Sequence, residues 1–215
     1  MARADEESGV FLSGVVLAAG FSRRMGRPKQ LLPLRGRPLL QHALDAAAAS
    51  CLDEIVLVLG SGAPQALEVL EFPDGTPVRV AVNEEPSAGQ SSSLRLGLRS
   101  ADSRAAAAAI LLGDQPQMTG ELIDRVATAF LTSETPVLRP VYSGPHGNLV
   151  PGHPVLLARR IWPEVETLRG EEGMRSMLAR RPEWLTELPL EGEPLRDIDN
   201  WEDYREAAEA ADTGD

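Results

Sequence analysis

Short apolar runs alternate with longer stretches in which apolar residues recur at helical spacing. This alternation predicts an α/β fold with three layers, a mostly parallel sheet covered by helices on both faces. The ranges expected as strands are 14–18, 54–59, 78–82, 107–112 and 136–142, with 185–190 as a returning edge strand. The ranges expected as helices are 38–50, 64–70, 92–100, 120–131, 173–180 and 201–211. Residues 143–154, rich in Gly and Pro, are expected to form a loop.

Charge is distributed unevenly along the chain. The 215 residues include 21 basic and 32 acidic side chains, a formal net charge of −11, so the mean field repels nucleic acid and anionic membranes. Residues 8–44 contain no acidic residue, and the rest of the chain therefore carries −17. The basic residues of this segment are Arg23, Arg24, Arg27, Lys29, Arg35 and Arg37. Such an island indicates either a bound anionic ligand or a solvated basic loop.

Lysine usage favours the first interpretation. Lys29 is the only lysine in the sequence, and the other 20 basic residues are arginines. A lysine is a compact point charge on a flexible stem, which suits a position between phosphate oxygens.

The expected location is the cytoplasm. No apolar run approaches the roughly 20 residues that span a bilayer. Asp5, Glu6 and Glu7 stand where a secretory signal needs positive charge. The single cysteine, Cys51, allows no internal disulfide.

The first expected strand leads into a loop with two glycines, Gly20 and Gly26, that allow backbone amides to approach an anion. The loop does not match a P-loop, because the lysine comes three positions after the second glycine and no Ser or Thr follows it. It does not match GxGxxG either, which disfavours a dinucleotide-binding turn.

The segment LAAGFSRRMGRPKQLLPLRGRPLL, residues 17–40, resembles the signature of molybdenum cofactor guanylyl- and cytidylyltransferases. The resemblance implies a nucleotide-diphospho-sugar transferase-like, Rossmann-related fold. It also implies that the loop amides of Ala18, Ala19 and Gly20 hold the nucleotide, and that Arg24 and Lys29 hold its phosphates. The Leu-Ala-Ala-Gly sequence that begins at Leu17 is similar to the cytidylyltransferase branch, which favours CTP.

The activity implied by this resemblance is Mg²⁺-dependent transfer of CMP from CTP to the phosphate of molybdopterin, with release of pyrophosphate. The product would pass to a molybdoenzyme or its chaperone. Alternatives are guanylyl transfer, transfer to a sugar or polyol phosphate, and a nucleotide-binding oxidoreductase or accessory protein that reuses the fold.

Asp114 follows the expected strand 107–112 and suits a Mg²⁺ ligand, because Mg²⁺ favours one or two carboxylates together with phosphate oxygens and water. Capping of the helix at 120 is the other role open to Asp114, but Thr119 is better placed for it. The resemblance of Asp-Gln-Pro to the family's metal motif supports ligation by Asp114. In the same way it implies that Asp199 is a second ligand, although Asp199 or Asn200 could simply cap the last helix.

Three further residues are candidates for ligand contacts. Asn83 and Ser92 lie in a loop of small polar residues before a helix, and similar family sequences hold the base or ribose there; capping by the serines is equally compatible. His153 lies in a Gly-His-Pro-Val segment that resembles a motif in the family's acceptor half. It is expected to contact the acceptor phosphate.

The expected organisation is a flexible N-terminal tip at 1–12 followed by a single domain at 13–211. The resemblance divides this domain into a nucleotide-binding part, about 13–116, and an acceptor part, about 117–211.

Overall fold

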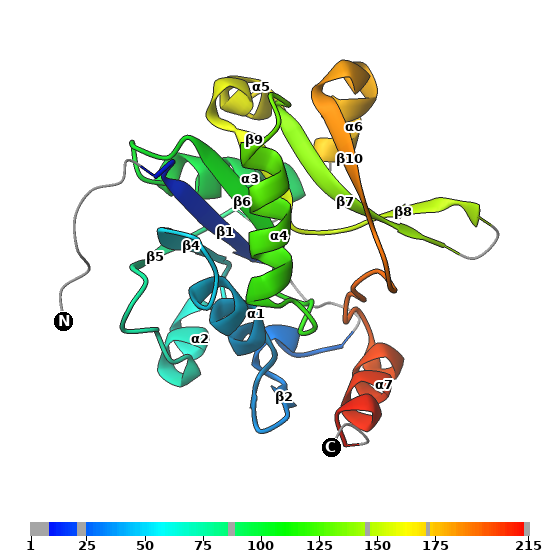
Figure 1. The fold of residues 1–215 in the computed structure, drawn as a ribbon. Helices are drawn as coiled ribbons and strands as arrows, with labels where there is room; N and C mark the ends of the chain where they lie inside the picture. The colour runs from blue at the N-terminus through cyan, green and yellow to red at the C-terminus, as the bar shows by residue number, and fades with distance from the viewer. Residues whose placement is uncertain (1–8, 21–24, 86–88, 145–146, 171–172, 213–215) are drawn as a thin grey trace, which may run out of the picture.

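The computed structural model describes residues 9–20, 25–85, 89–144, 147–170 and 173–212. Within these ranges an eight-stranded sheet has the strand order β10-β7-β9-β6-β1-β4-β5, and β8 pairs with β7 (Figure 1). The strands are β1 (Leu12–Ala18), β4 (Glu54–Leu59), β5 (Val78–Val82), β6 (Ala107–Leu112), β7 (Val137–Ser143), β8 (Leu149–Pro151), β9 (Val155–Ala158) and β10 (Leu185–Leu190). A separate two-stranded sheet joins β2 (Pro33–Leu34) to β3 (Arg37–Pro38). Because β1 already begins at Leu12, the last residue of the expected tip belongs to the sheet.

The sheet is mostly parallel, as predicted. β1 runs parallel to β4 and β6, β4 to β5, and β7 to β10, whereas β9 is antiparallel to both β6 and β7. The prediction of a loop over 143–154 was wrong for residues 149–151, which form β8, and β9 was not predicted at all. Both are antiparallel to β7 because the chain reverses direction through a short connection, and a parallel pairing needs a long crossover.

Helices cover both faces of the sheet. They are α1 (Leu39–Ala48), α2 (Ala63–Val69), α3 (Gln90–Ser100), α4 (Gly120–Leu131), α5 (Trp162–Val165), α6 (Met174–Arg180) and α7 (Trp201–Asp212). Short 3-10 turns are η1 (Lys29–Leu31), η4 (Arg159–Ile161) and η5 (Pro182–Trp184). The first predicted helix begins at Leu39 rather than at residue 38, because Pro38 keeps an extended ψ of 142°.

Alternate residues of each strand feed two separate apolar layers. Val16 packs on one face with Leu44 of α1 and Ile123 of α4, whereas Val15 packs on the other with Leu94 of α3 and Leu178 of α6. The first face, covered by α1 and α4, is turned toward the viewer in Figure 1. This division confirms the predicted three-layer arrangement.

Residues near the C-terminus pack against the segment at 33–39. Ile198, only 1% exposed, packs with Leu34 and Leu39 in a small third cluster, and Tyr204 of α7 contacts the same cluster. The Tyr204 hydroxyl also donates to the carbonyl oxygen of Pro33. These contacts fix α7 beside the β2–β3 hairpin (Figure 1).

Over the described part of the chain, no helix is both long and apolar enough to cross a bilayer.

Candidate active site

Three charged side chains from distant parts of the chain meet at the carboxyl end of the sheet. Lys29 lies on η1, Asp114 follows β6, and Asp199 lies just before α7. The Lys29 Nζ atom donates to Asp114 Oδ2 and to Asp199 Oδ1, each at 2.7 Å. The proximity of Lys29 to Asp114, on which the interpretation of the sequence depends, is therefore present in the structure.

The two ion pairs are unequally buried. The Lys29 side chain is 10% exposed and that of Asp114 is 22% exposed, but that of Asp199 is 50% exposed. Water and salt screen exposed ion pairs, and buried ones are costly to break. The Lys29–Asp114 pair is therefore the one on which the local structure depends, while Asp199 is accessible to a ligand.

The surroundings raise the pKa values of both Lys29 and Asp114. Burial lowers the pKa of the Lys29 ammonium, but the carboxylates of Asp114 and Asp199 outweigh burial and leave it above its usual value. Burial raises the pKa of the Asp114 carboxyl, Lys29 opposes that shift, and the nearby charges of Asp197 and Asp199 add to it. The Lys29 ammonium thus pairs with two carboxylates, and a third, that of Asp197, adds negative charge near Asp114; this excess of negative charge favours an additional cation.

One oxygen of the Asp114 carboxylate has no hydrogen-bond partner among the described residues. Asp114 Oδ1 is buried and makes no hydrogen bond within the described ranges. An unsatisfied buried carboxylate oxygen is costly, and a cation or an ordered water would remove that cost.

The donor set fits a magnesium-like ion. Across the described residues, no group of three or more His, Cys, Asp and Glu side chains is arranged to hold a metal ion alone. A cation on Asp114 and Asp199 would therefore complete its shell with water and ligand oxygens, as Mg²⁺ commonly does. Zinc, which prefers three or four nitrogen or sulfur ligands, does not fit these residues.

Thr119 and Asn200, rather than Asp114 and Asp199, cap the helices α4 and α7. Thr119 Oγ1 accepts a hydrogen bond from the Leu122 amide at 3.2 Å and caps α4, as the sequence suggested. Asn200 Oδ1 accepts from the amides of Glu202 and Asp203 at 2.7 and 3.1 Å and caps α7. The Asp199 carboxylate is therefore not used as a cap.

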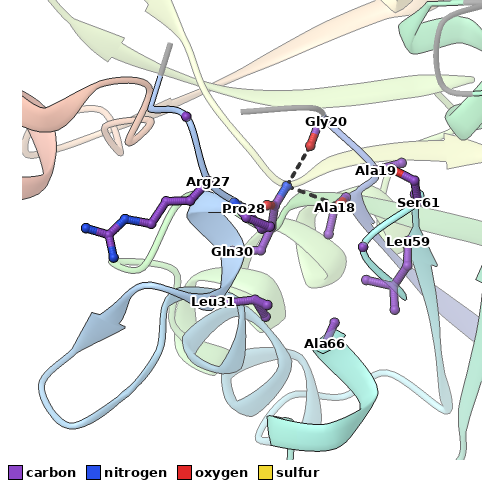
Figure 2. A pocket seen from close by; sticks show the side chains of 13 residues that line it. Ala18, Ala19, Gly20, Arg27, Pro28, Gln30, Leu31, Leu59, Ser61 and Ala66 are labelled. Carbon is purple, nitrogen blue, oxygen red and sulfur yellow. Dashed lines mark hydrogen bonds between the residues drawn. The ribbon is translucent and has the colours of Figure 1, made fainter. Parts of the chain in front are cut away.

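A cavity of about 350 Å³ opens beside Lys29, between the loops that follow β1 and β4. Its lining includes the predicted nucleotide-binding residues Ala18, Ala19 and Gly20 (Figure 2). The rest of the lining comes from Gly26, Arg27, Pro28, Gln30, Leu31, Leu59, Gly60, Ser61, Gly62 and Ala66. The predicted phosphate residue Arg24 lies outside the described residues.

Sequence reasoning missed Gln30, which fixes the shape of this cavity. The Gln30 side chain is 7% exposed, and its Nε2 donates to the carbonyl oxygens of Ala18 and Gly20 at 3.2 and 3.1 Å (Figure 2). These bonds hold the end of β1 against η1. The adjacency of Gln30 to the unique lysine was the only signal in the sequence.

The loop after β4 was also missed. A Cβ atom on Gly60 would lie 2.7 Å from the Ala19 carbonyl oxygen, so only glycine allows this close approach of the two loops. The sequence shows Gly60 and Gly62 as ordinary turn glycines, and it does not reveal their neighbour.

Leu17, predicted to belong to the nucleotide site, lines a different cavity. Successive side chains of a strand point to opposite faces, so Leu17 and Ala18 face opposite sides of the sheet. The second cavity, also about 350 Å³, is mostly apolar. It is lined by Leu17, Gln90, Leu94, Ile110, Leu112, Arg139, Pro151, Gly152, His153, Val155, Gly173, Met174, Arg175 and Leu178.

His153 lies in this second cavity, in the half of the chain expected to bind the acceptor. Burial lowers the pKa of its imidazole to about 4, although the negative charge of Asp114 opposes the shift. His153 is therefore neutral near pH 7. Asp114 does not line this cavity, but Leu112, two residues before it, does. Two arginines that the sequence did not single out, Arg139 and Arg175, supply its positive charge.

Asn83 and Ser92 are brought together, but they line neither of these cavities. Asn83 Nδ2 donates to the hydroxyls of Ser92 and Ser93 at 2.8 and 3.0 Å, and its Oδ1 accepts from the Glu85 amide at 3.0 Å. In this arrangement Asn83 stabilises the start of α3. Contact with a nucleotide stays a prediction for these two residues.

Relatives share most of the chain. It is 34% identical over 183 residues to nicotine blue oxidoreductase of Paenarthrobacter nicotinovorans, covering 82% of this chain and 85% of the relative. It is 34% identical over 174 residues to the purine catabolism protein PucB of Bacillus subtilis, covering 78% and 80%.

Solved structures resemble the whole fold. Rv0371c from Mycobacterium tuberculosis has a TM-score of 0.81 and 32% identity, covering 94% of this chain and 99% of that one. A nucleotidyl transferase from Methanothermobacter thermautotroptrophicus has a TM-score of 0.77 at 23% identity, covering 96% and 100%, which shows the fold alone. The expected transferase-like fold is confirmed.

The family follows from a match over most of the sequence. A family model described as the MobA-like NTP transferase domain matches residues 14–184, which include Lys29 and Asp114. The match confirms the family resemblance that rests on residues 17–40 and on the Asp-Gln-Pro sequence at 114–116. The chain belongs to the MobA-like NTP transferase family.

Proposed function

We propose that this protein is a cytoplasmic, divalent-metal-dependent nucleotidyltransferase that transfers CMP from CTP to the phosphate of molybdopterin and releases pyrophosphate. The observation that carries the proposal is the cluster of Lys29, Asp114 and Asp199, with Nζ 2.7 Å from each carboxylate. Nucleotidyl transfer requires positioning and charge neutralisation of phosphates rather than a protein nucleophile, and these are the groups that supply them.

The residues of the cluster fit a Mg²⁺ ion. Asp114 offers a buried oxygen that no described residue hydrogen-bonds, and Asp199 offers a half-exposed carboxylate. A second solved structure of Rv0371c, with a TM-score of 0.77 to this chain and 32% identity, is described as a complex with manganese. When bound, such an ion neutralises phosphate oxygens and polarises the phosphorus that is attacked.

The protein's own groups divide the remaining work between the two cavities. On the nucleotide side, the loop that Gln30 pins presents Gly20 to the ligand, and Arg24 and Lys29 neutralise the phosphates. On the acceptor side, the neutral imidazole of His153 is a hydrogen-bond donor for a phosphate oxygen and does not add charge. Lys29 exchanges its two carboxylates for phosphate oxygens as the nucleotide enters.

The two cavities support transfer between two different substrates. They are of equal volume, about 350 Å³ each, and open on opposite sides of the end of β1, which Ala18 and Leu17 line. The cluster lines neither cavity, but Pro28 and Gln30 of the first cavity flank Lys29 in the chain, and Leu112 of the second cavity precedes Asp114 by two residues. The preference for CTP rests on the Leu-Ala-Ala-Gly sequence at 17–20, and the choice of molybdopterin rests on the same resemblance. The recipient of the product would be a molybdoenzyme or its chaperone.

The direct test is pyrophosphate release with each of the four ribonucleoside triphosphates, Mg²⁺ and purified molybdopterin. We expect CTP with molybdopterin to give the highest rate and a chelator to abolish it. Equal rates with a sugar phosphate or a polyol phosphate as acceptor would contradict the molybdopterin assignment, and a preference for GTP would contradict the cytidylyl assignment. Full activity in the absence of any divalent ion would contradict the proposed metal dependence.

A second candidate function comes from one relative. Nicotine blue oxidoreductase is 34% identical to this chain over most of its length, and a member of this family can therefore carry an oxidoreductase name. Oxidation of a reduced pyridine nucleotide in the presence of a quinonoid dye, without pyrophosphate release, would favour this candidate. The carboxylate cluster argues against it, because hydride transfer has no need of a cation between Asp114 and Asp199.

A further inference from the structure

A buried glutamine links the two segments that supply the aspartates of the cluster. Gln115, which directly follows Asp114, is 4% exposed, and its Nε2 donates to Asp197 Oδ1 at 2.8 Å. Asp197 precedes Asp199 by two residues. The link therefore runs from the residue next to one aspartate to a residue close to the other.

A second bond runs alongside it through the backbone. The amide of Ile198 donates to the carbonyl oxygen of Asp114 at 3.0 Å, and the Ile198 side chain is 1% exposed. Residues 197–199, which we call the C-terminal arm, are thus attached to the turn after β6 at consecutive positions: Asp197 by Gln115, Ile198 by the backbone, and Asp199 through Lys29.

The neutral amide of Gln115 matters because of the charge around it. Asp197 is close enough to Asp114 to influence its ionisation, so the arm would be repelled from the turn if nothing held it. An amide donor satisfies the Asp197 carboxylate without adding a cation that competes for Asp114. A glutamate at 115 would place two carboxylates in contact.

Packing alone does not account for a glutamine at this position. Gln115 Oε1 is buried and makes no hydrogen bond in the described part of the chain. Burying half of an amide without a partner costs free energy, and an apolar side chain of similar size would avoid that cost. The bond to Asp197 is the feature that an apolar residue could not provide.

We propose that Gln115 is a positioning residue that acts through Asp197 to hold the C-terminal arm, so that Asp199 faces Asp114 across the cation site. The proposal rests on the proposed metal site, and it assigns to Gln115 and Asp197 a role in metal affinity although neither is a ligand.

The test exchanges the two polar groups. Gln115→Glu places a carboxylate against Asp197, and we expect the affinity for Mn²⁺, measured by electron paramagnetic resonance, to fall about tenfold or more. Asp197→Asn added to Gln115→Glu restores a hydrogen bond of reversed direction with the original total charge. We expect this double variant to regain an affinity within about threefold of wild type.

A matched control separates positioning from stability. Gln41 is 1% exposed, and its Nε2 donates to Asp45 Oδ1 and to the carbonyl oxygen of Glu71, each at 2.8 Å. None of these residues belongs to the cluster or to the C-terminal arm. Gln41→Glu should lower the melting temperature as Gln115→Glu does, but it should leave Mn²⁺ affinity unchanged. If Gln41→Glu weakened Mn²⁺ binding as much, the effect would be general destabilisation and the proposal would fail.

Hydrogen exchange at the Ile198 amide gives a readout that needs no metal. Exchange should be faster in Gln115→Glu and should return to the wild-type rate in the double variant. Wild-type exchange and wild-type Mn²⁺ affinity in Gln115→Glu would overturn the proposal. An absence of Mn²⁺ binding to the wild-type protein would overturn the metal site instead, and Ile198 exchange would then still decide whether Gln115 holds the arm.

Discussion

Replacing Lys29 with methionine is the most informative single perturbation of the cluster. Methionine keeps most of the side-chain volume but removes an ammonium that is 10% exposed and bonded at 2.7 Å to two carboxylates. Breaking a buried ion pair from one side costs about 3–5 kcal/mol, whereas an exposed pair contributes below about 1 kcal/mol. Most of the loss therefore comes from Asp114, and we expect the free energy of unfolding to fall by about 3 kcal/mol.

The loss should depend on pH and on metal. Asp114 already has a raised pKa in the folded state, and loss of Lys29 raises it further. A folded carboxyl with a raised pKa binds protons more readily than the unfolded chain does, so the variant becomes less stable as the pH rises above the usual aspartate range. Acidification toward pH 4 should reduce the difference in the free energy of unfolding between Lys29→Met and wild type. Millimolar Mn²⁺ at neutral pH should reduce the same difference.

Metal affinity and turnover should move in opposite directions. In the wild-type protein a cation must displace the Lys29 ammonium from both carboxylates, so Lys29→Met should bind Mn²⁺ about tenfold more tightly when nucleotide is absent. Turnover with CTP should nevertheless fall about 10²-fold or more, because phosphate stabilisation is lost. Calorimetric titration and pyrophosphate release measure the two effects. Weaker Mn²⁺ binding combined with normal turnover would refute both the competition and the role of Lys29.

Three smaller predictions concern the rest of the site. Asp114→Asn should weaken the Mg²⁺ dependence of turnover, because it removes a proposed ligand, and the protein should stay folded because Asp199 still pairs with Lys29; an unchanged Mg²⁺ titration would contradict ligation. Gly60→Ala places a Cβ 2.7 Å from the Ala19 carbonyl oxygen, and it should lower stability by about 1–3 kcal/mol in urea denaturation and weaken CTP binding. His153 titrates near pH 4, below its usual value, so turnover of wild type and of His153→Asn should show the same pH dependence between 5 and 8. A pH-rate limb in that range that disappears in the variant would instead make His153 a proton carrier.

The parallel core of the fold was predictable because its central strands are nearly continuous apolar runs. The strands at 54–59 and 107–112 have the predicted bounds, since a strand that is buried on both faces needs no polar alternation. The strand at 78–82 also has the predicted bounds, although it lies at the sheet edge and Arg79 is exposed. β8 and β9 could not be recognised in the same way. β8 has a half-exposed residue between two exposed ones, and β9 spans only Val155–Ala158, so glycine and proline dominated the sequence signal around them.

In the candidate site, too, some residues could be recognised from local sequence and others could not. Lys29 and Asp114 could be selected from the sequence because charge and position after a strand are local properties, and Asp199 could be selected through resemblance. Their contact joins residues 85 and 170 positions apart, which only the topology of the sheet determines. Gln30 and Gln115 could not be recognised as site residues, because the role of an uncharged amide depends on its hydrogen-bond partner, which the sequence does not show.

The placement of these two glutamines has a physical logic. Each glutamine directly follows a charged residue of the cluster. The Nε2 atom of Gln30 donates to the end of β1 and to Gly20, and the Nε2 atom of Gln115 donates to the C-terminal arm. A neutral donor can fix a loop in low-dielectric surroundings without shifting the ionisation of the charged residue beside it, whereas a lysine or arginine would compete for the same carboxylates. The charge of the site can then be reserved for Lys29, the two aspartates and the ligands. Because the holding groups are uncharged, substitutions of Gln30 and Gln115 by other uncharged residues should alter affinity for nucleotide and metal while the ionisation of Lys29 and Asp114 stays as it is.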